Sequence, residues 1–253
     1  MSSLYQKIIK IENGSLRAAL CTIIATKGSA PRKTGAKMLV YENGFIEGTI
    51  GGGALEKKVI AQSLEVIRNN EAKKVTHNLV SELAMCCGGT VELFIEPIMN
   101  RKKLYIFGAG HCGKALAKFA IDLDFDVTLI DERYDAVEGI DLPECTIIQE
   151  HHATAIEQLG FDEHTYIVIL TFDHSYDREI LALTSKKAHR YIGMIGSSRK
   201  VAIAKKNMIA SNILTEQEVE KIDMPIGLDI NAITPQEIAI SILAKLIDER
   251  NKK

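Results

Sequence analysis

A glycine-rich loop behind an apolar run is the pattern in this sequence with the clearest spacing for chemistry. Residues 108–113 read GAGHCG, a G-x-G-x-x-G pattern directly after the apolar run LYIF at 104–107. In such a loop the first glycine permits a tight turn, the second lets the backbone approach a pyrophosphate, and the third lets a helix pack close to the strand. The alternative is a glycine-rich turn in another kind of α/β domain. The predicted dinucleotide contacts are Gly108, Gly110, His111 and Gly113.

An acid and an arginine lie where such a fold recognises a ribose. Asp131 ends the apolar run 127–130, at the place where an acid accepts a hydrogen bond from a ribose 2′-hydroxyl. A 2′-phosphate beside this carboxylate would be repelled, so we expect NAD(H) to bind in preference to NADP(H). The guanidinium of Arg133 could still accommodate a phosphate. Ser197 and Arg199, after the apolar run 191–195, are further candidate contacts at the same edge.

A basic, small-residue segment near the N-terminus points to a second anion. Five basic residues and no acidic residue lie between Glu12 and Glu42. The loop 28–32 has short side chains that expose backbone N–H groups, and Gly51-Gly52-Gly53 precedes a predicted helix whose N-terminus can hold a phosphate. The alternative is a solvated basic loop and a tight strand-to-helix turn. The candidate anion contacts are Lys27, Ser29, Arg32, Gly51, Gly52 and Gly53.

Adjacent cysteines form a third candidate site. Cys86-Cys87 precedes two glycines, and thiolates bind soft metals and carry sulfur. The spacing does not fit a zinc C-x-x-C pair, and no histidine lies at a suitable offset. Cys86 and Cys87 are therefore candidates for sulfur or metal handling. The alternative is one buried cysteine that packs as a small hydrophobe.

The histidines do not suggest a metal set. His151 and His152 precede a predicted helix and are expected to be solvated at the surface. His111 and His174 are better placed, because both should lie at the carboxyl edge of a parallel sheet, where ligands bind. Neither a Tyr-x-x-x-Lys pair nor a well-placed His–Asp dyad is evident as a proton donor.

Two segments with different patterns must position these residues. Residues 1–99 combine predicted strands with two predicted helices, which indicates an α+β domain. Residues 100–253 alternate strands and helices, which predicts a doubly wound parallel sheet. The predicted strands are 16–25, 36–41, 45–50, 72–80 and 90–96 in the first domain, and 104–107, 127–130, 146–148, 165–171 and 191–195 in the second. The main predicted helices are 3–13, 54–68, 154–159, 177–188, 199–212 and one opened by the capping box at 234–237.

Composition excludes several classes of protein. The chain has 253 residues, of which 25% are charged and 46% hydrophobic, an ordinary soluble balance. Its net charge of −2 does not favour nucleic acid as a partner. No apolar run approaches membrane-spanning length, and the first residues lack the apolar core of a signal peptide. Five cysteines fit a reducing compartment better than a disulfide framework, so a cytoplasmic location is expected.

Six stretches of the sequence resemble the XdhC/CoxI family, accessory factors that mature xanthine dehydrogenase and related molybdenum hydroxylases. They are GSAPRKTGAKMLV (28–40), GTIGGGALE (48–56), CCGGTVELFIEP (86–97), LYIFGAGHCGKALA (104–117), RYIGMIGSSRK (190–200) and PIGLDINAITPQEIAISILA (225–244). The resemblance implies an α/β protein with an α+β N-terminal XdhC/CoxI-type domain and a Rossmann-like domain after it. Ala54 stands where CoxI-like members carry cysteine, which favours the XdhC branch.

The resemblance implies a cofactor-insertion chaperone more than a catalyst. It implies that the protein binds molybdenum cofactor, supports its sulfuration by a cysteine desulfurase, and delivers it to a xanthine dehydrogenase-type apoenzyme. The cofactor is a pterin dithiolene bearing a phosphate, which fits the basic loop and leaves the sulfur chemistry to Cys86 and Cys87. A homodimer is expected from fold analogy and from the role of a carrier.

Two alternatives from other classes stay open. One is an NAD(P)-dependent oxidoreductase acting on a small substrate, which the missing proton donor disfavours. The other is a redox-sensing regulator that binds NAD and switches through Cys86 and Cys87.

Overall fold

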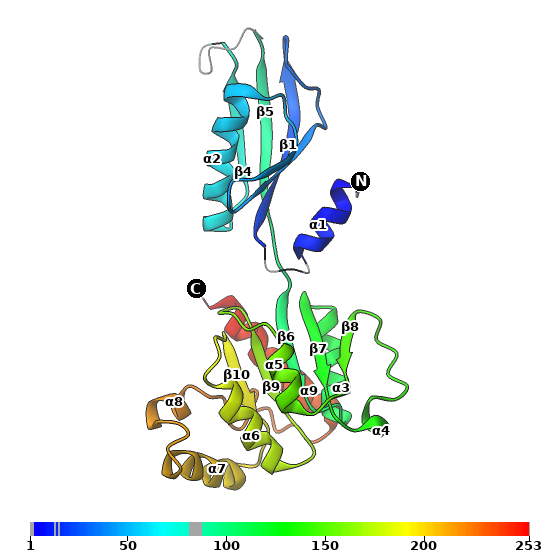
Figure 1. Ribbon diagram of the computed structural model, residues 1–253, viewed down its shortest axis with the longest axis vertical. Helices are drawn as coiled ribbons and strands as arrows, with labels where there is room; N and C mark the ends of the chain where they lie inside the picture. The colour runs from blue at the N-terminus through cyan, green and yellow to red at the C-terminus, as the bar shows by residue number, and fades with distance from the viewer. Residues whose placement is uncertain (1–2, 13, 15, 81–87, 253) are drawn as a thin grey trace. The chain divides into compact units, whose positions relative to one another are not determined.

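The chain divides into two compact units, each with its own sheet and core. The computed structural model describes residues 3–12, 14, 16–80 and 88–252. The units are Met1–Arg101 and Lys102–Lys253 (Figure 1). Within the described residues, no helix combines the length and the apolar character needed to cross a bilayer.

An antiparallel sheet of five strands forms the first unit. The strands lie in the order β3-β2-β1-β5-β4. Their bounds are β1 (Ala18–Lys27), β2 (Lys37–Tyr41), β3 (Ile46–Gly48), β4 (Lys73–Asn78) and β5 (Thr90–Ile98), with the helices α1 (Leu4–Glu12) and α2 (Gly53–Asn69). The strand predicted over 45–50 is shorter, because Gly48 at φ +80° leaves the extended conformation.

Alternation along β1 divides the first unit into two small cores. Cys21 and Ile23 point to the side covered by α2, where they pack with Leu55 and Val59 of that helix. The alternate residue Leu20 packs with Ile11 of α1 in a separate cluster. Pairing of Lys27 with Thr90, and of Thr22 with Lys37, brings the loop after β1 and the start of β5 to one end of the sheet.

The second unit is a parallel sheet in the order β10-β9-β6-β7-β8, which confirms the predicted fold class. The strands are β6 (Lys102–Phe107), β7 (Phe125–Ile130), β8 (Cys145–Ile148), β9 (Tyr166–Ile169) and β10 (Tyr191–Met194). The chain starts at the central strand, moves out to β8, and returns past the centre to β10. The strand order reverses at β6 and β9, and the carboxyl ends of such strands are the usual ligand position in parallel sheets.

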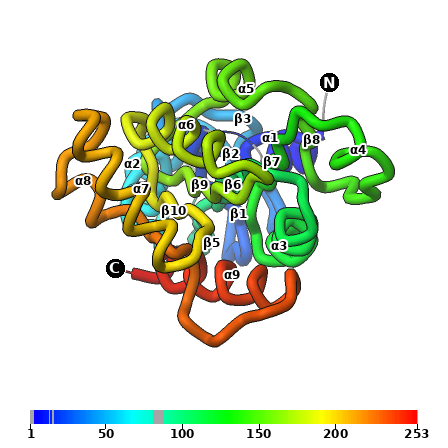
Figure 2. Tube along the Cα trace, turned by 90° about the horizontal axis from the view of Figure 1, so that it is seen from below, coloured from blue at the N-terminus to red at the C-terminus, as the bar shows by residue number. Residues whose placement is uncertain are grey.

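Helices cover both faces of the parallel sheet. Helices α3 and α9 pack on one face, while α5 and α6 pack on the other (Figure 2). The bounds are α3 (His111–Ile121), α4 (Tyr134–Val137), α5 (His152–Gln158), α6 (His174–Thr184), α7 (Ser198–Ala210), α8 (Glu216–Glu220) and α9 (Pro235–Asn251). Helix α6 begins three residues before the predicted start at 177, because Asp173 caps it by accepting from the Ser175 amide.

Candidate functional site

The glycine-rich loop of the second unit joins β6 to α3 and is shaped by close backbone contacts. Gly108 has φ +115°, and a Cβ there would lie 2.2 Å from the carbonyl oxygen of Leu170. A Cβ on Gly113 would lie 1.9 Å from the carbonyl oxygen of Gly108. Both positions therefore accept glycine alone. At Gly110, in contrast, a Cβ would meet nothing within 4 Å, so the loop backbone there faces open space.

The N-terminus of α3 is free to receive an anion. Gly110 is its N-cap and supplies no side-chain hydrogen bond, and no acidic residue lies in the first turn. His111 is exposed as the first helical residue. The N–H groups of a first turn lack intrahelical partners and carry a partial positive charge. This arrangement can hold a phosphate, which is the role that the spacing predicts.

The carboxylate of Asp131, predicted to accept from a ribose hydroxyl, accepts hydrogen bonds from within the chain. Its carboxylate, only 3% exposed, accepts from the Ala109 amide at 2.8 Å and from Arg133 through Nε at 2.9 Å and Nη2 at 2.7 Å. The Arg133 amide donates as well, at 3.1 Å. Four donors fill the capacity of a carboxylate, so the ribose acceptor role is already occupied within the chain. The charge of Asp131 is balanced by Arg133.

The ionised state of Asp131 follows from these contacts. Burial opposes the charged form, but the hydrogen bonds from Arg133 and from the Ala109 amide outweigh that cost and hold the pKa of the Asp131 carboxyl below its usual value. The guanidinium of Arg133 also stacks on Phe172, with Cζ 4.2 Å from the ring centroid.

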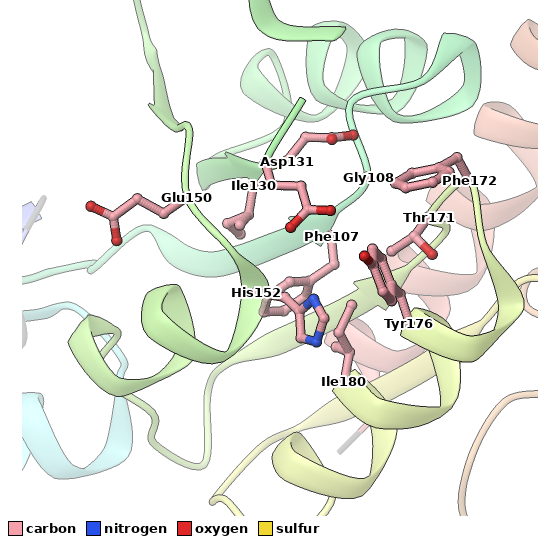
Figure 3. A pocket seen from close by; sticks show the side chains of 11 residues that line it. Phe107, Gly108, Ile130, Asp131, Glu150, His152, Thr171, Phe172, Tyr176 and Ile180 are labelled. Carbon is pink, nitrogen blue, oxygen red and sulfur yellow. The ribbon is translucent and has the colours of Figure 1, made fainter. Parts of the chain in front are cut away.

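A small pocket lies between Asp131 and α6 (Figure 3). The aromatic side chains that line it are Phe107, His152, Phe172 and Tyr176. The cavity holds about 20 Å³, room for about one water molecule. The Phe172 side chain is 55% exposed, and its ring packs against that of Tyr176 with the centroids 5.4 Å apart.

His152 corrects the prediction of two solvated histidines. His151 is exposed and caps α5, but His152 is 5% exposed because its ring packs against Tyr176, with centroids 5.0 Å apart. Its Nε2 atom lies 3.2 Å from Glu179 Oε2 but is not aligned for a hydrogen bond. No local pattern indicates this burial, because it depends on α5 meeting α6.

A hydrogen-bonded chain of side chains lies beyond the pocket, after β9 and β10. Asp177 is fully buried, and His174 Nδ1 lies 2.8 Å from its Oδ2 atom. Lys200 Nζ lies 2.8 Å from His174 Nε2. This corrects the expectation that no His–Asp dyad is present. The available signal was an acid three residues after His174 in the first turn of a helix, where i and i+3 share a face.

The two predicted anion contacts at the start of α7 differ in role, because one caps the helix and the other is exposed. Ser197 is the N-cap of α7, and its hydroxyl accepts from the Lys200 amide at 3.4 Å. Arg199 is exposed in the first turn of the same helix. Both residues stay at the carboxyl edge of the sheet, so Arg199 is the one whose side chain is available to a ligand.

In the first unit, three predicted segments meet at one end of the sheet. A Cβ on Gly89 would lie 2.3 Å from the carbonyl oxygen of Ser29 and 2.7 Å from that of Lys27. A Cβ on Gly51 would lie 2.4 Å from Pro31 Cγ and 3.8 Å from Arg32 Cγ. The basic loop thus contacts both the Gly51–Gly53 turn and the glycines that follow the cysteine pair. Lys27, Ser29 and Arg32 are exposed there.

Cys86 and Cys87 lie outside the described residues. Among the residues that the structure does describe, no three histidine, cysteine, aspartate or glutamate side chains gather as a metal site.

An internal carboxylate occupies part of the Gly51–Gly53 turn. Glu56 Oε1 accepts from the Gly52 amide at 2.9 Å, the Ile50 amide at 3.1 Å and the Thr49 hydroxyl at 2.6 Å. The Gly51 amide donates to Thr49 Oγ1 at 3.1 Å. Burial opposes ionisation of Glu56, but these hydrogen bonds outweigh it and lower the pKa of the carboxyl. Gly51 and Gly52 are therefore not free phosphate donors.

Three bacterial proteins are similar in sequence to this chain. It is 31% identical over 255 residues to the uncharacterized protein YqeB of Escherichia coli (strain K12), covering 98% of this chain and 46% of YqeB. It is 27% identical over 164 residues to a probable xanthine dehydrogenase subunit from Bacillus subtilis (strain 168), covering 64% of this chain and 47% of that subunit. It is 20% identical over 268 residues to the molybdenum cofactor insertion chaperone PaoD of E. coli, covering 92% and 83%. The chain spans about half the length of the first two.

The fold also has a counterpart among crystal structures. A protein described as a xanthine dehydrogenase from Bacillus halodurans aligns with a TM-score of 0.55 at 23% identity, covering 100% of this chain and 97% of that one. This likeness supports the fold.

Family comparison covers both units. Residues 13–78 match the XdhC and CoxI family, and residues 104–246 match the XdhC Rossmann domain. The second match spans more than half of the chain and contains the glycine-rich loop, Asp131 and His174. The chain belongs to the XdhC/CoxI family.

Proposed function

We propose that this protein is an accessory factor in the maturation of a molybdenum hydroxylase, with molybdenum cofactor as its cargo. The observation that carries the proposal is the meeting of the basic loop, the Gly51–Gly53 turn and the glycines after Cys87 at one end of the first sheet. PaoD, described as a molybdenum cofactor insertion chaperone, aligns along most of this chain and supports the same role.

The phosphate of the cofactor is expected to bind through side chains more than through the glycine turn. Thr49 and Glu56 already accept from the amides of Gly51 and Gly52. Arg32 and Lys27 are exposed beside that turn and carry the positive charge that a phosphate needs. We assign Arg32 the main contact, because its Cγ atom lies 3.8 Å from the Cβ position of Gly51.

Cys86 and Cys87 are the proposed sulfur-handling residues. Gly89, the second glycine after them, approaches the backbone of Lys27 and Ser29, so this segment ends beside the proposed phosphate contacts. We propose that a cysteine desulfurase supplies the sulfur, and that the sulfurated cofactor passes to a xanthine dehydrogenase-type apoenzyme in the cytoplasm.

The second unit is proposed to bind NAD(H) or NADP(H). The open backbone at Gly110 and the uncapped start of α3 support a pyrophosphate at this place. Pairing with Arg133 weakens the repulsion between Asp131 and a 2′-phosphate, so we expect the preference for NAD(H) to be small. A homodimer remains part of the proposal. Light scattering that gives the 27.9 kDa mass of one chain would contradict it.

The decisive experiment is activation of a cofactor-free molybdenum hydroxylase by the loaded protein. A charge-assisted hydrogen bond contributes about 1.5–3 kcal/mol, so Arg32→Ala should weaken cofactor binding about ten- to a hundredfold. The neighbouring exposed residue gives a matched control. Lys33→Ala should change the affinity for the cofactor by about threefold or less. Failure of the wild-type protein to bind or transfer cofactor would overturn the proposal.

A second variant addresses the cysteines alone. The double variant Cys86→Ser/Cys87→Ser should fold normally and still bind cofactor, but the cofactor it delivers should lack the exchangeable sulfur. The readout is the activity of the reconstituted hydroxylase, measured before and after chemical sulfuration. Full activity without that treatment would contradict the assignment of the cysteines and leave the carrier role intact.

A further inference from the structure

A second cavity lies between the first turns of α6 and α7, within the second unit. It holds about 150 Å³ and lies at the carboxyl end of β10. His174, Asp177, Arg178 and Lys200 form its polar wall. The opposite wall is apolar and comes from Met194 and Ile195 at the end of β10 together with Val201, Ile203 and Ala204 of α7.

The polar wall contains an ordered chain of hydrogen bonds. Asp177 Oδ1 accepts from the Thr171 amide at 2.9 Å and from the Thr171 hydroxyl at 2.7 Å. Its Oδ2 atom is 2.8 Å from His174 Nδ1, and His174 Nε2 is 2.8 Å from Lys200 Nζ. The chain therefore runs from a fully buried acid to a lysine at the cavity wall.

Donor and acceptor counts give a consistent arrangement of protons along this chain. The Thr171 amide donates to Asp177 Oδ1, and the Thr171 hydroxyl has one proton for two acceptors, Asp177 Oδ1 and the Asp173 carbonyl oxygen. With Asp177 as an acceptor, His174 donates to it from Nδ1, and His174 Nε2 accepts from Lys200 Nζ. Lys200 is then the group that presents a proton at the cavity wall.

This chain is linked directly to the glycine-rich loop. A Cβ on Gly108 would lie 3.0 Å from Thr171 Cα, and Thr171 in turn holds Asp177. In the sheet, Asp131 follows β7 on one side of β6, whereas His174 follows β9 on the other. A dinucleotide with its adenosine near Asp131 and its pyrophosphate at Gly110 directs its nicotinamide toward β9 and β10.

We propose that Lys200 and His174 form a general acid–base site for hydride transfer between a nicotinamide dinucleotide and a small 2-oxo or 2-hydroxy acid, with Asp177 as the positioning residue. The inference rests on the dinucleotide part of the proposed function. It supplies the proton donor that the sequence alone did not reveal.

The class of substrate follows from size and charge. A protein cavity of about 150 Å³ can hold a molecule the size of benzene, so this cavity suits a compound of about six non-hydrogen atoms. Arg178 and the N-terminal end of α7, which has no acidic residue in its first turn, favour a carboxylate. The apolar wall suits a short alkyl group on the other side of the reacting carbon.

The proposed step balances as follows. Hydride leaves C4 of the reduced nicotinamide and bonds to the carbonyl carbon of the oxo acid, and the electron pair of the C=O π bond moves to oxygen. That oxygen takes the proton from Lys200 Nζ, which gives the hydroxy acid and the oxidised dinucleotide. Water restores the proton to the pair, since the His174 side chain is 47% exposed. The reverse reaction uses the same groups with the proton moving to the pair.

The test combines nucleotide binding with turnover in the full-length protein. Binding of NADH and NADPH is measured by titration. Oxidation of the bound nucleotide is followed by its absorbance, with glyoxylate, pyruvate and 2-oxobutyrate as the oxo acids to be reduced. General acid–base groups contribute about 10²–10⁴ in rate, so His174→Gln and Lys200→Met should each lower kcat about a hundredfold or more. Nucleotide affinity should stay within about twofold, because neither residue lies in the glycine-rich loop.

Matched controls come from two residues outside the cavity, the exposed Lys206 and the half-buried His189. Lys206→Met on the same helix and His189→Gln should leave kcat within about twofold. Asp177→Asn should lower kcat about tenfold with KM unchanged, and Asp177→Glu should recover part of that loss. A residue with only a structural role would instead change the unfolding temperature and KM together.

The outcomes separate this inference from the rest. If the protein binds dinucleotide but reduces none of the probes, or if the His174 and Lys200 variants reduce them as fast as the wild type does, the acid–base site is overturned and dinucleotide binding still stands. A protein that binds no dinucleotide overturns both. Neither result bears on the proposed transfer of molybdenum cofactor by the first unit, which the hydroxylase activation assay measures separately.

Discussion

Two glycine-rich turns in this protein lead from a strand into a helix, and they differ in what occupies the helix N-terminus. The turn Gly51–Gly53 enters α2, and its amides meet the Glu56 carboxylate and the Thr49 hydroxyl. The turn Gly108–Gly113 enters α3, where no acid lies in the first turn and the N-cap has no side chain. Both turns look alike as glycine patterns. One is closed by its own chain, and the other is open to a ligand.

The difference shows what makes a helix N-terminus an anion site. Unpaired N–H groups and a partial positive charge are present at every helix start, so any nearby acid can satisfy them. Glu56 lies four residues after Gly52 and folds back onto the turn. Helix α3 has Lys114 at the equivalent place after Gly110, so nothing within the helix competes with a phosphate. An anion site therefore depends as much on a missing acid as on the glycines.

The largest expected effect comes from filling the tightest contact of the open turn. Gly113→Ala places a Cβ 1.9 Å from the carbonyl oxygen of Gly108, so the helix must separate from the strand. We expect a loss of about 3 kcal/mol or more in the free energy of unfolding of the second unit, measured by denaturant titration. Gly110→Ala is the matched control, with a change below about 1 kcal/mol. Equal stability of the two variants would contradict this account of the turn.

Blocking the open turn without straining it should remove the ligand and keep the fold. Gly110 has φ −70° and space around its Cβ position, so Gly110→Val folds with a stability change of about 1 kcal/mol or less. The valine side chain fills the space that a pyrophosphate needs, and we expect dinucleotide affinity to fall about fiftyfold or more. Titration calorimetry measures the change. Unaltered affinity would mean that the pyrophosphate does not lie at this turn.

Removing the internal acid should weaken the closed turn. Glu56→Gln loses charge-assisted hydrogen bonds and is expected to lower the unfolding free energy of the first unit by about 1–3 kcal/mol at pH 7. Because the folded-state pKa of Glu56 is lowered, this stabilisation is present above the ordinary pKa of 4.5 and is lost as the pH falls through the lowered value. Wild type and variant should therefore converge in acid.

The control for Glu56 lies on the same helix. Glu65 is 53% exposed and 3.7 Å from Lys73, so Glu65→Gln should change stability by about 0.5 kcal/mol or less at any pH. A constant difference between wild type and Glu56→Gln from neutral to strongly acidic pH would show that the carboxylate charge is not what holds the turn.

The smallest expected effect is on the choice of nucleotide at the open turn. Arg133→Ala removes the cation that balances Asp131, so a 2′-phosphate would meet an uncompensated carboxylate. We expect the affinity for NADP(H) relative to NAD(H) to fall about five- to tenfold, measured by parallel titrations. Lys118→Ala, on the exposed side of α3, should leave the ratio unchanged. An unchanged ratio in Arg133→Ala would place the ribose away from this pair.

The local patterns of the sequence were sufficient for the fold class and for the open turn. The close approach of Gly113 to Gly108 lies within one strand–loop–helix unit, and apolar periodicity marks each strand by itself. Alternating strands and helices with right-handed crossovers leave few arrangements of a parallel sheet. These properties are encoded within about thirty consecutive residues, which is the length of a βαβ unit.

Tertiary structure decided which polar side chains meet. Lys200 is 26 residues from His174 in sequence, and they touch because β9 and β10 are neighbours and their following helices begin at the same edge. Burial of His152 required α5 to pack on α6. Periodicity assigns residues to faces of their own element. Hydrogen bonds between elements depend on distances that only the packed chain sets.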